Sequence, residues 1–212
     1  MGLDWNPGPK AKPGCEQEFT ELWRKLNSGR WCFGRERKVK RFSEITQTAF
    51  ETLRTPRVGF DVAATNWARQ MFPNRQDKSL TEDGFIGGMK GFYVLDLVPP
   101  CDGLPRYSNG QPGGYVERYS FRAQFLADCV EIIGQELLDA GYGSKAAEET
   151  IGHGGKLLER ASQFAQAHRM DMSKLPPPED PDSMQFHLDV VIAAGRWCRF
   201  WGEKGHWLEA YF

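Results

Sequence analysis

The second half of the chain carries apolar side chains at the spacing of amphipathic helices. Residues 120–140 spread them over a broad arc, which predicts a helix that ends at Gly141. Residues 144–169 repeat small side chains at alternating steps of four and three, which favours one long helix packed closely on its predecessor. Its three glycines could instead break this helix: Gly152, Gly154 and Gly155. From Ser183 to about Trp201 the chain is apolar on two sides, so this helix is expected to be central.

The first half predicts shorter helices. Apolar residues recur every three or four positions after Cys15, and capping residues precede the later segments. We expect helices over residues 15–26, from Ser43 to about Arg54, over 61–72, and a short one after Ser79 or Thr81.

The strand pattern is weaker than the helix pattern. Residues 91–98 are short, β-branched and aromatic, and they end at a Pro-Pro pair, so they form the best predicted strand. Its partner is expected among residues 30–34, residues 56–60 or the C-terminal run HWLEAYF. Residues 30–42 are predicted to be a strand or an extended connection.

These elements predict an α+β, predominantly helical fold. We expect a helical bundle-like core, a small β-sheet or hairpin and one long ordered loop, all within a single domain of residues 1–212. An N-terminal wrap over residues 1–14 would be anchored by Trp5. The long loop spans residues 99–119, and a connector rich in proline and acid spans residues 171–182.

Composition narrows the class of protein. Aromatic residues make up 13% of the 212 residues, which indicates a substantial core and excludes disorder of the whole chain. Five cysteines without a CxxC pair fit reduced thiols. No apolar window is long enough to cross a bilayer and no signal peptide is evident, so a cytoplasmic, bacterial-type protein without membrane contact is expected.

The net charge of −1 conceals an asymmetry between the two parts of the chain. Residues 1–78 carry 15 Lys and Arg against 9 Asp and Glu, whereas residues 79–212 carry 12 against 19. A basic cluster lies between Arg30 and Arg41, but Glu36 dilutes it and few aromatic residues accompany it. Nucleic acid is therefore not the favoured partner.

The loop at 99–119 and the helix start after it form the predicted binding surface. Loops of this length within compact domains are usually functional or disordered. Paired arginines beside a helix start favour a carboxylate or a phosphate, and tyrosines supply a stacking wall. The candidate binding residues are Arg106, Tyr107, Tyr115, Arg118, Tyr119 and Arg122.

Candidate catalytic residues are fewer and lack a defining motif. Cys101 is the one cysteine in a loop, and His153 is the one histidine in a glycine-rich setting. Asp102 beside Cys101 disfavours the thiolate, so a thiol packed under an aromatic ring is the alternative. The four histidines show no metal-ligand spacing and no glycine-rich loop follows a strand, so neither a metal nor a cofactor is expected. Asp96 is an acid/base candidate if the strand buries it.

Two functions follow from these features. The first is a protein-binding module, of the inhibitor, immunity-type or adaptor kind, which acts through residues 99–122. The alternative is an enzyme for a small anionic substrate, with Arg106, Arg118 and Arg122 as a clamp and with Cys101, Asp102 or His153 in proton transfer or attack. We expect either a protein partner or a small anionic ligand.

Overall fold

A computed structural model describes residues 2–27, 34–75, 77–99, 120–170, 172 and 182–212. The predicted loop and connector fall almost entirely outside these residues. The fold is α+β and mostly helical, as the sequence predicts. Its N-terminal elements are β1 (Asp4–Pro7), β2 (Lys10–Ala11), α1 (Glu16–Asn27), α2 (Arg35–Ile45), β3 (Thr46–Gln47), α3 (Ala49–Thr52), α4 (Val62–Met71), η1 (Phe72–Asn74), α5 (Glu82–Gly88) and η2 (Leu95–Leu97). Its C-terminal elements are η3 (Ala123–Cys129), α6 (Val130–Ile133), α7 (Gln135–Gly141), α8 (Ala147–Ala167), α9 (Met184–Glu203) and β4 (Leu208–Tyr211).

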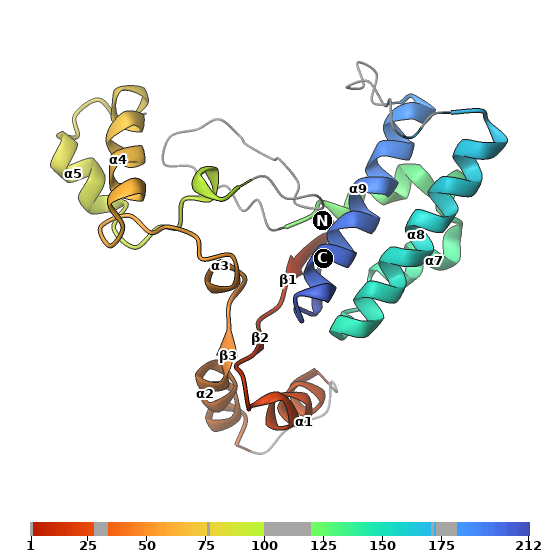
Figure 1. Cartoon of the computed structure of the whole chain (residues 1–212), viewed down its shortest axis with the longest axis horizontal. Coiled ribbons are helices and arrows are strands. Elements are labelled where there is room, and N and C mark those ends of the chain that lie inside the picture. Colours follow the sequence, from red (N-terminus) through yellow and green to blue (C-terminus); the bar gives the residue numbers. More distant parts are fainter. Residues whose placement is uncertain (1, 28–33, 76, 100–119, 171, 173–181) are drawn as a thin grey trace.

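Helices α8 and α9 form the centre of the larger core (Figure 1). Glycine brings their backbones together: a Cβ added at Gly154 would lie 2.7 Å from the Cys198 Cβ and 2.7 Å from the Gly195 oxygen. Helix α8 is one continuous helix, as its small-residue seam predicts, but the seam faces the helix that follows it rather than the one before. Helix α9 buries both of its apolar sides, which confirms its predicted central position.

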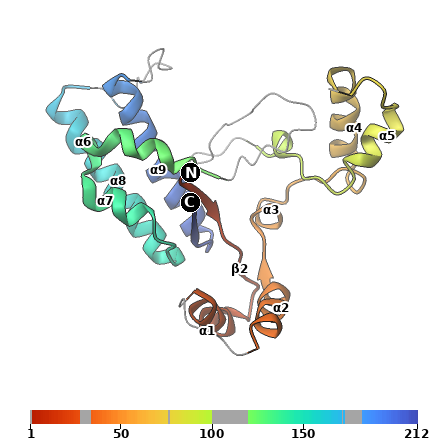
Figure 2. The ribbon, with the colours of Figure 1, turned by 180° about the vertical axis from the view of Figure 1, so that it is seen from behind.

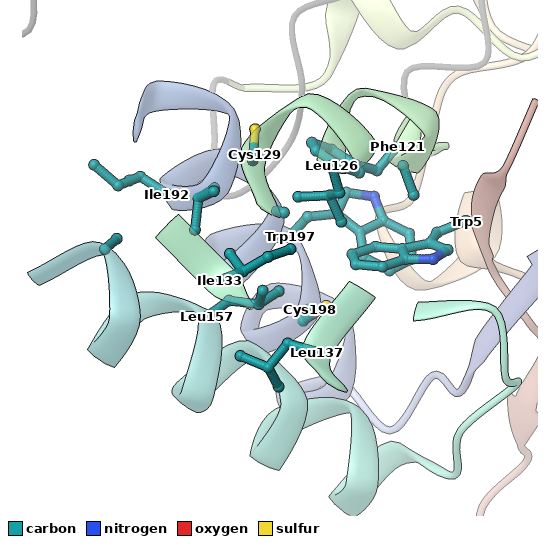
Figure 3. Close-up of a cluster of buried hydrophobic side chains, with 14 of the residues drawn as sticks. Trp5, Phe121, Leu126, Cys129, Ile133, Leu137, Leu157, Ile192, Trp197 and Cys198 are labelled. Carbon is teal, nitrogen blue, oxygen red and sulfur yellow. The ribbon is translucent and has the colours of Figure 1, made fainter. Parts of the chain in front are cut away.

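Trp5 anchors the N-terminus in this core. Its indole N–H donates to the Gly141 oxygen at 2.8 Å, and its ring lies 5.9 Å from the ring of Trp197. Figure 3 shows both rings beside Phe121 and Leu126 in the buried cluster. Strand β1 pairs with β4 in an antiparallel register, so the two ends of the chain meet on one side of the bundle (Figures 1 and 2). Residues 4–7 of the predicted N-terminal wrap, residues 1–14, therefore form a strand.

A buried histidine joins three distant segments. The His206 Nδ1 lies 2.8 Å from the Gly8 oxygen, and its Nε2 lies 2.8 Å from the Thr52 hydroxyl. A carbonyl only accepts, so Nδ1–H donates to Gly8, and Nε2 of the neutral ring is an acceptor for the Thr52 hydroxyl. That hydroxyl also lies 3.1 Å from the Thr48 oxygen, so its one proton is shared between two acceptors. Burial lowers the pKa of His206 to about 4, which keeps the ring neutral at neutral pH.

Two predicted segments near the N-terminus are wrong in type or extent. Residues 35–42 of the expected strand or extended connection lie in α2, where Arg41 pairs with Glu18 of α1 at 2.7 Å and Phe42 stacks on Phe19. The expected helix from Ser43 is interrupted by β3, which pairs with β2. Its first residues, 43–45, form the end of α2, and residues 49–52 form α3.

The predicted strand at 91–98 shrinks to a single bridge between Arg57 and Tyr93. Val94 donates to the Pro56 oxygen at 2.8 Å, but Pro56 has no N–H to return the bond, so the ladder stops and η2 follows. Asp96 lies exposed in η2, so the condition set for its acid/base role, burial in a strand, is not met. Of the three partner segments expected for this strand, residues 56–60 supply the bridge, through Arg57.

The predicted helix at 120–140 is divided. Phe121 exchanges backbone bonds of 2.8 Å with Trp5, and η3, α6 and α7 follow in series. Gly134 has a φ of 77° between α6 and α7, a conformation that continues neither helix. The apolar arc is nevertheless buried as the sequence predicts.

Candidate functional site

Helices α4 and α5 form a small lobe that lies apart from the α8–α9 pair, with α3 between them (Figure 1). Its own core consists of Val58, Ala64, Ala68 and Val94. Because neighbouring residues of an extended chain point to opposite faces, burial of Val58 and Val94 places Arg57 and Tyr93 on the outer face. The bridge thus sets a cation beside an aromatic ring at the surface of this lobe.

Arg57 is held between two rings. Its guanidinium carbon lies 3.8 Å from the centre of the Phe60 ring and 5.6 Å from that of Tyr93. The Asp61 carboxylate accepts the Arg57 backbone N–H at 2.7 Å and fixes the turn that carries Phe60. Such contacts orient a guanidinium while leaving its N–H donors available to a ligand.

The outer face of the lobe is hollowed beside this bridge. A groove of about 370 Å³ is lined by Phe50, Lys90, Gly91, Phe92 and Tyr93. Phe50 comes from α3, whose start is fixed by a capping box between Thr48 and Glu51. We call these five residues, together with Arg57 and Phe60, the aromatic–cation groove.

Two of its rings are stacked and two are open to solvent. Phe50 and Tyr93 lie 4.4 Å apart between ring centres at an interplanar angle of 15°. Phe60 is 62% exposed and Phe92 is 38% exposed. Lys90 lies across the Phe60 turn, since a Cβ added at Gly59 would approach the Lys90 Cγ to 2.9 Å.

The cations of the groove lack acidic partners within the described ranges. No described carboxylate forms an ion pair with Arg57 or with Lys90. By contrast, Arg41 is paired with Glu18 and Arg199 with Glu203. The aromatic–cation groove therefore combines exposed rings with two cations that no described carboxylate pairs.

A second hollow of about 390 Å³ lies at the end of α1. Its lining consists of Trp23, Arg24, Asn27 and Ser144. The Asn27 amide donates to the Trp23 oxygen at 3.0 Å and the Ser144 hydroxyl accepts the Ala210 N–H at 3.2 Å, so two of its polar groups are already engaged. It has no stacked pair of rings among its described lining residues.

Most of the residues predicted for binding lie outside the described part of the chain. These are Arg106, Tyr107, Tyr115, Arg118 and Tyr119, and the candidate catalytic residues Cys101 and Asp102 lie outside it as well. Arg122 is described: it is exposed and stands at the start of η3. The predicted anion clamp remains a prediction.

His153 is described and lies in the core. It faces Trp5 edge-on at 5.5 Å between ring centres and is 5% exposed. Burial lowers its pKa to about 4, and the charges of Lys145 and Lys156 act in the same direction. The ring is therefore neutral at neutral pH and has the surroundings of a core histidine, and its predicted catalytic role is not tested by this placement.

The described residues include no group of three or more His, Cys, Asp or Glu side chains that could hold a metal ion. In the same residues, no helix combines the length and apolar character needed to cross a membrane. Cys15, Cys129 and Cys198 carry free thiols, and burial raises the pKa of Cys129 to about 12. The placement of Cys129 and Cys198 in the core fits packing rather than nucleophilic chemistry.

No family model, curated protein or solved structure matches this chain. The geometry of the groove therefore carries the functional argument alone.

Sequence reasoning missed the aromatic–cation groove. The sequence predicts a strand at residues 91–98, with residues 56–60 among its possible partners, but it does not indicate which side chains of such a pair are exposed. The chain has three Gly-Phe steps, at Gly59, Gly84 and Gly91, and only two of their rings are exposed, since Phe85 is buried. The sequence therefore carries no clear signal for the groove.

Proposed function

We propose that this protein is a binding module that docks a partner protein on the aromatic–cation groove. The observation that carries the proposal is the coincidence of exposed Phe60 and Phe92 with Arg57 and Lys90, neither of which has a described acidic partner. Aromatic residues and arginine dominate the energetics of protein interfaces. Clustered exposed rings are typical of interaction surfaces.

An inhibitor, immunity-type or adaptor role suits such a module. The sequence also predicts a binding role for the loop at 99–119, which begins six residues after Tyr93 in the chain. The free thiols of Cys15, Cys129 and Cys198 support a reducing compartment such as the cytoplasm.

Site-specific photo-crosslinking tests the proposal. A benzophenone amino acid is placed at Phe60 or at Phe92, and at Val39 as a control, since Val39 is exposed on α2, outside the groove. Irradiation in the native host should yield one adduct of the same mass from both groove positions and none from the control. No adduct, or the same adducts from all three positions, would contradict the proposal.

A second variant links the adduct to the groove itself. Phe60→Ser combined with Phe92→Ser removes two partly exposed rings, so the free energy of unfolding should fall by about 1–3 kcal/mol through the apolar burial that is lost. The crosslinked partner, once identified and purified, should lose at least about tenfold in affinity for this variant. Unchanged affinity would refute the assignment of the surface.

A further inference from the structure

The backbone at Tyr93 presents an open strand edge. Val58 donates to the Phe92 oxygen at 2.9 Å and Val94 to the Pro56 oxygen at 2.8 Å, so Arg57 and Tyr93 face each other between two bonds. In an antiparallel pair, residues in this position direct their own N–H and C=O groups away from the partner. Neither group of Tyr93 bonds to another residue in the described segments.

An open edge of this kind is a template for an added strand. A peptide that pairs with Tyr93 would gain main-chain hydrogen bonds, and its alternate side chains would point to the groove face. The short length of the edge limits such pairing to a few residues. A groove of about 370 Å³ correspondingly admits only a few side chains.

The charge of the groove selects the side chains of that peptide. Arg57 is oriented by Phe60 and Tyr93 and has no described carboxylate partner, and Lys90 lies beside the same turn. A guanidinium fixed in this way binds a carboxylate with two parallel hydrogen bonds. The stacked Phe50 and Tyr93 offer an apolar surface next to the cations.

We infer that the aromatic–cation groove binds an extended segment of the partner protein in which acidic and aromatic residues alternate at positions i and i+2. The segment adds to the edge at Tyr93 and places its carboxylates against Arg57 and Lys90. This inference rests on the proposed function and specifies the chemistry of the partner.

Fluorescence anisotropy with three labelled heptapeptides tests the inference. The probe is Thr-Glu-Thr-Phe-Thr-Glu-Thr, which puts both acids and the ring on one face of a strand. A charge control replaces both Glu residues by Gln. A register control, Thr-Thr-Glu-Phe-Glu-Thr-Thr, has the same composition but puts the acids and the ring on opposite faces.

The probe should bind with a Kd lower by about tenfold or more than that of either control peptide. Arg57→Gln combined with Lys90→Gln should abolish the difference between the probe and its charge control. The matched variant Arg24→Gln, at the second hollow, should leave that difference unchanged. Methylation of the peptide nitrogens should weaken binding of the probe, since it removes main-chain donors.

Equal binding of the three peptides, or a preference that survives the loss of Arg57 and Lys90, would overturn the inference. The proposed function fails separately. If photo-crosslinks at Phe60 and Phe92 persist while the peptides bind alike or not at all, the docking surface stands and the acidic strand is refuted. If the peptides discriminate as expected but no crosslink forms, the chemistry stands and the proposed protein partner is refuted.

Discussion

The substitution Gly154→Ala should destabilise the protein, because α8 and α9 touch at this residue. An added Cβ would lie 2.7 Å from the Cys198 Cβ, 2.7 Å from the Gly195 oxygen and 3.2 Å from the Arg199 nitrogen. Carbon atoms normally approach to about 3.5–4.0 Å, so the helices would have to separate by about 1 Å. Two of the three obstructing atoms belong to the backbone of α9 and cannot move alone.

The magnitude follows from two opposing effects. Forcing a methyl group into a packed core costs about 1–3 kcal/mol, whereas Ala gains up to about 1 kcal/mol over Gly in a helix. We expect a net loss of about 1–2 kcal/mol for Gly154→Ala. A Cβ at Gly155 meets no heavy atom of the described residues within 4 Å, so Gly155→Ala should gain up to about 1 kcal/mol instead.

Urea unfolding of the two variants and the wild type measures the difference. The free energies of unfolding should differ by about 1–3 kcal/mol, which separates the thermal midpoints by about 2–12 °C. Gly195→Ala, whose Cβ would lie 2.6 Å from the Leu158 Cγ, should behave like Gly154→Ala. Equal stability of the two α8 variants would refute the close contact between the helices.

Two further predictions concern the core. Because the pKa values of His153 and His206 are lowered to about 4 from 6.5, the unfolded state binds protons first as the pH falls. Stability should therefore be complete only above about pH 7.5 and fall by about 1 kcal/mol per histidine between pH 7.5 and pH 5.5 in urea titrations, and a flat profile would contradict their burial. Gly8→Ala should cost about 2 kcal/mol, because its Cβ would lie 2.1 Å from the Trp207 Cε2; calorimetry that shows no loss would contradict this packing.

The fold could be predicted where helical periodicity is strong and uninterrupted. The seam of α8 and the two apolar sides of α9 are readable because every turn repeats the same spacing over about twenty residues. The division of residues 120–140 could not be predicted, since the positive φ at Gly134 depends on how η3 packs rather than on the local pattern. The strand predicted at 91–98 does not form, because Pro56 has no N–H to extend the pairing. Pro56 lies far from residues 91–98 in the sequence, so the local pattern does not show this limit.

The candidate binding site agrees with the sequence prediction only in residue type. The sequence predicts tyrosine and arginine in the loop at 99–119, whereas the aromatic rings and cations of the groove come from residues 50, 57–60 and 90–93. Phe60 and Phe92 would be read as core residues from hydropathy alone, and only the folded chain shows that they are 62% and 38% exposed. Tertiary pairing decides exposure, and a single sequence does not specify it.

Amide chemical shifts measured by NMR during titration with the acidic probe peptide test the central claim most directly. Docking on the aromatic–cation groove should shift the amides of Arg57, Phe60 and Lys90, and the Tyr93 amide should also become slower to exchange with solvent as it gains a hydrogen bond. Shifts confined to the hollow beside Trp23, or an unchanged Tyr93 amide at saturation, would contradict the account.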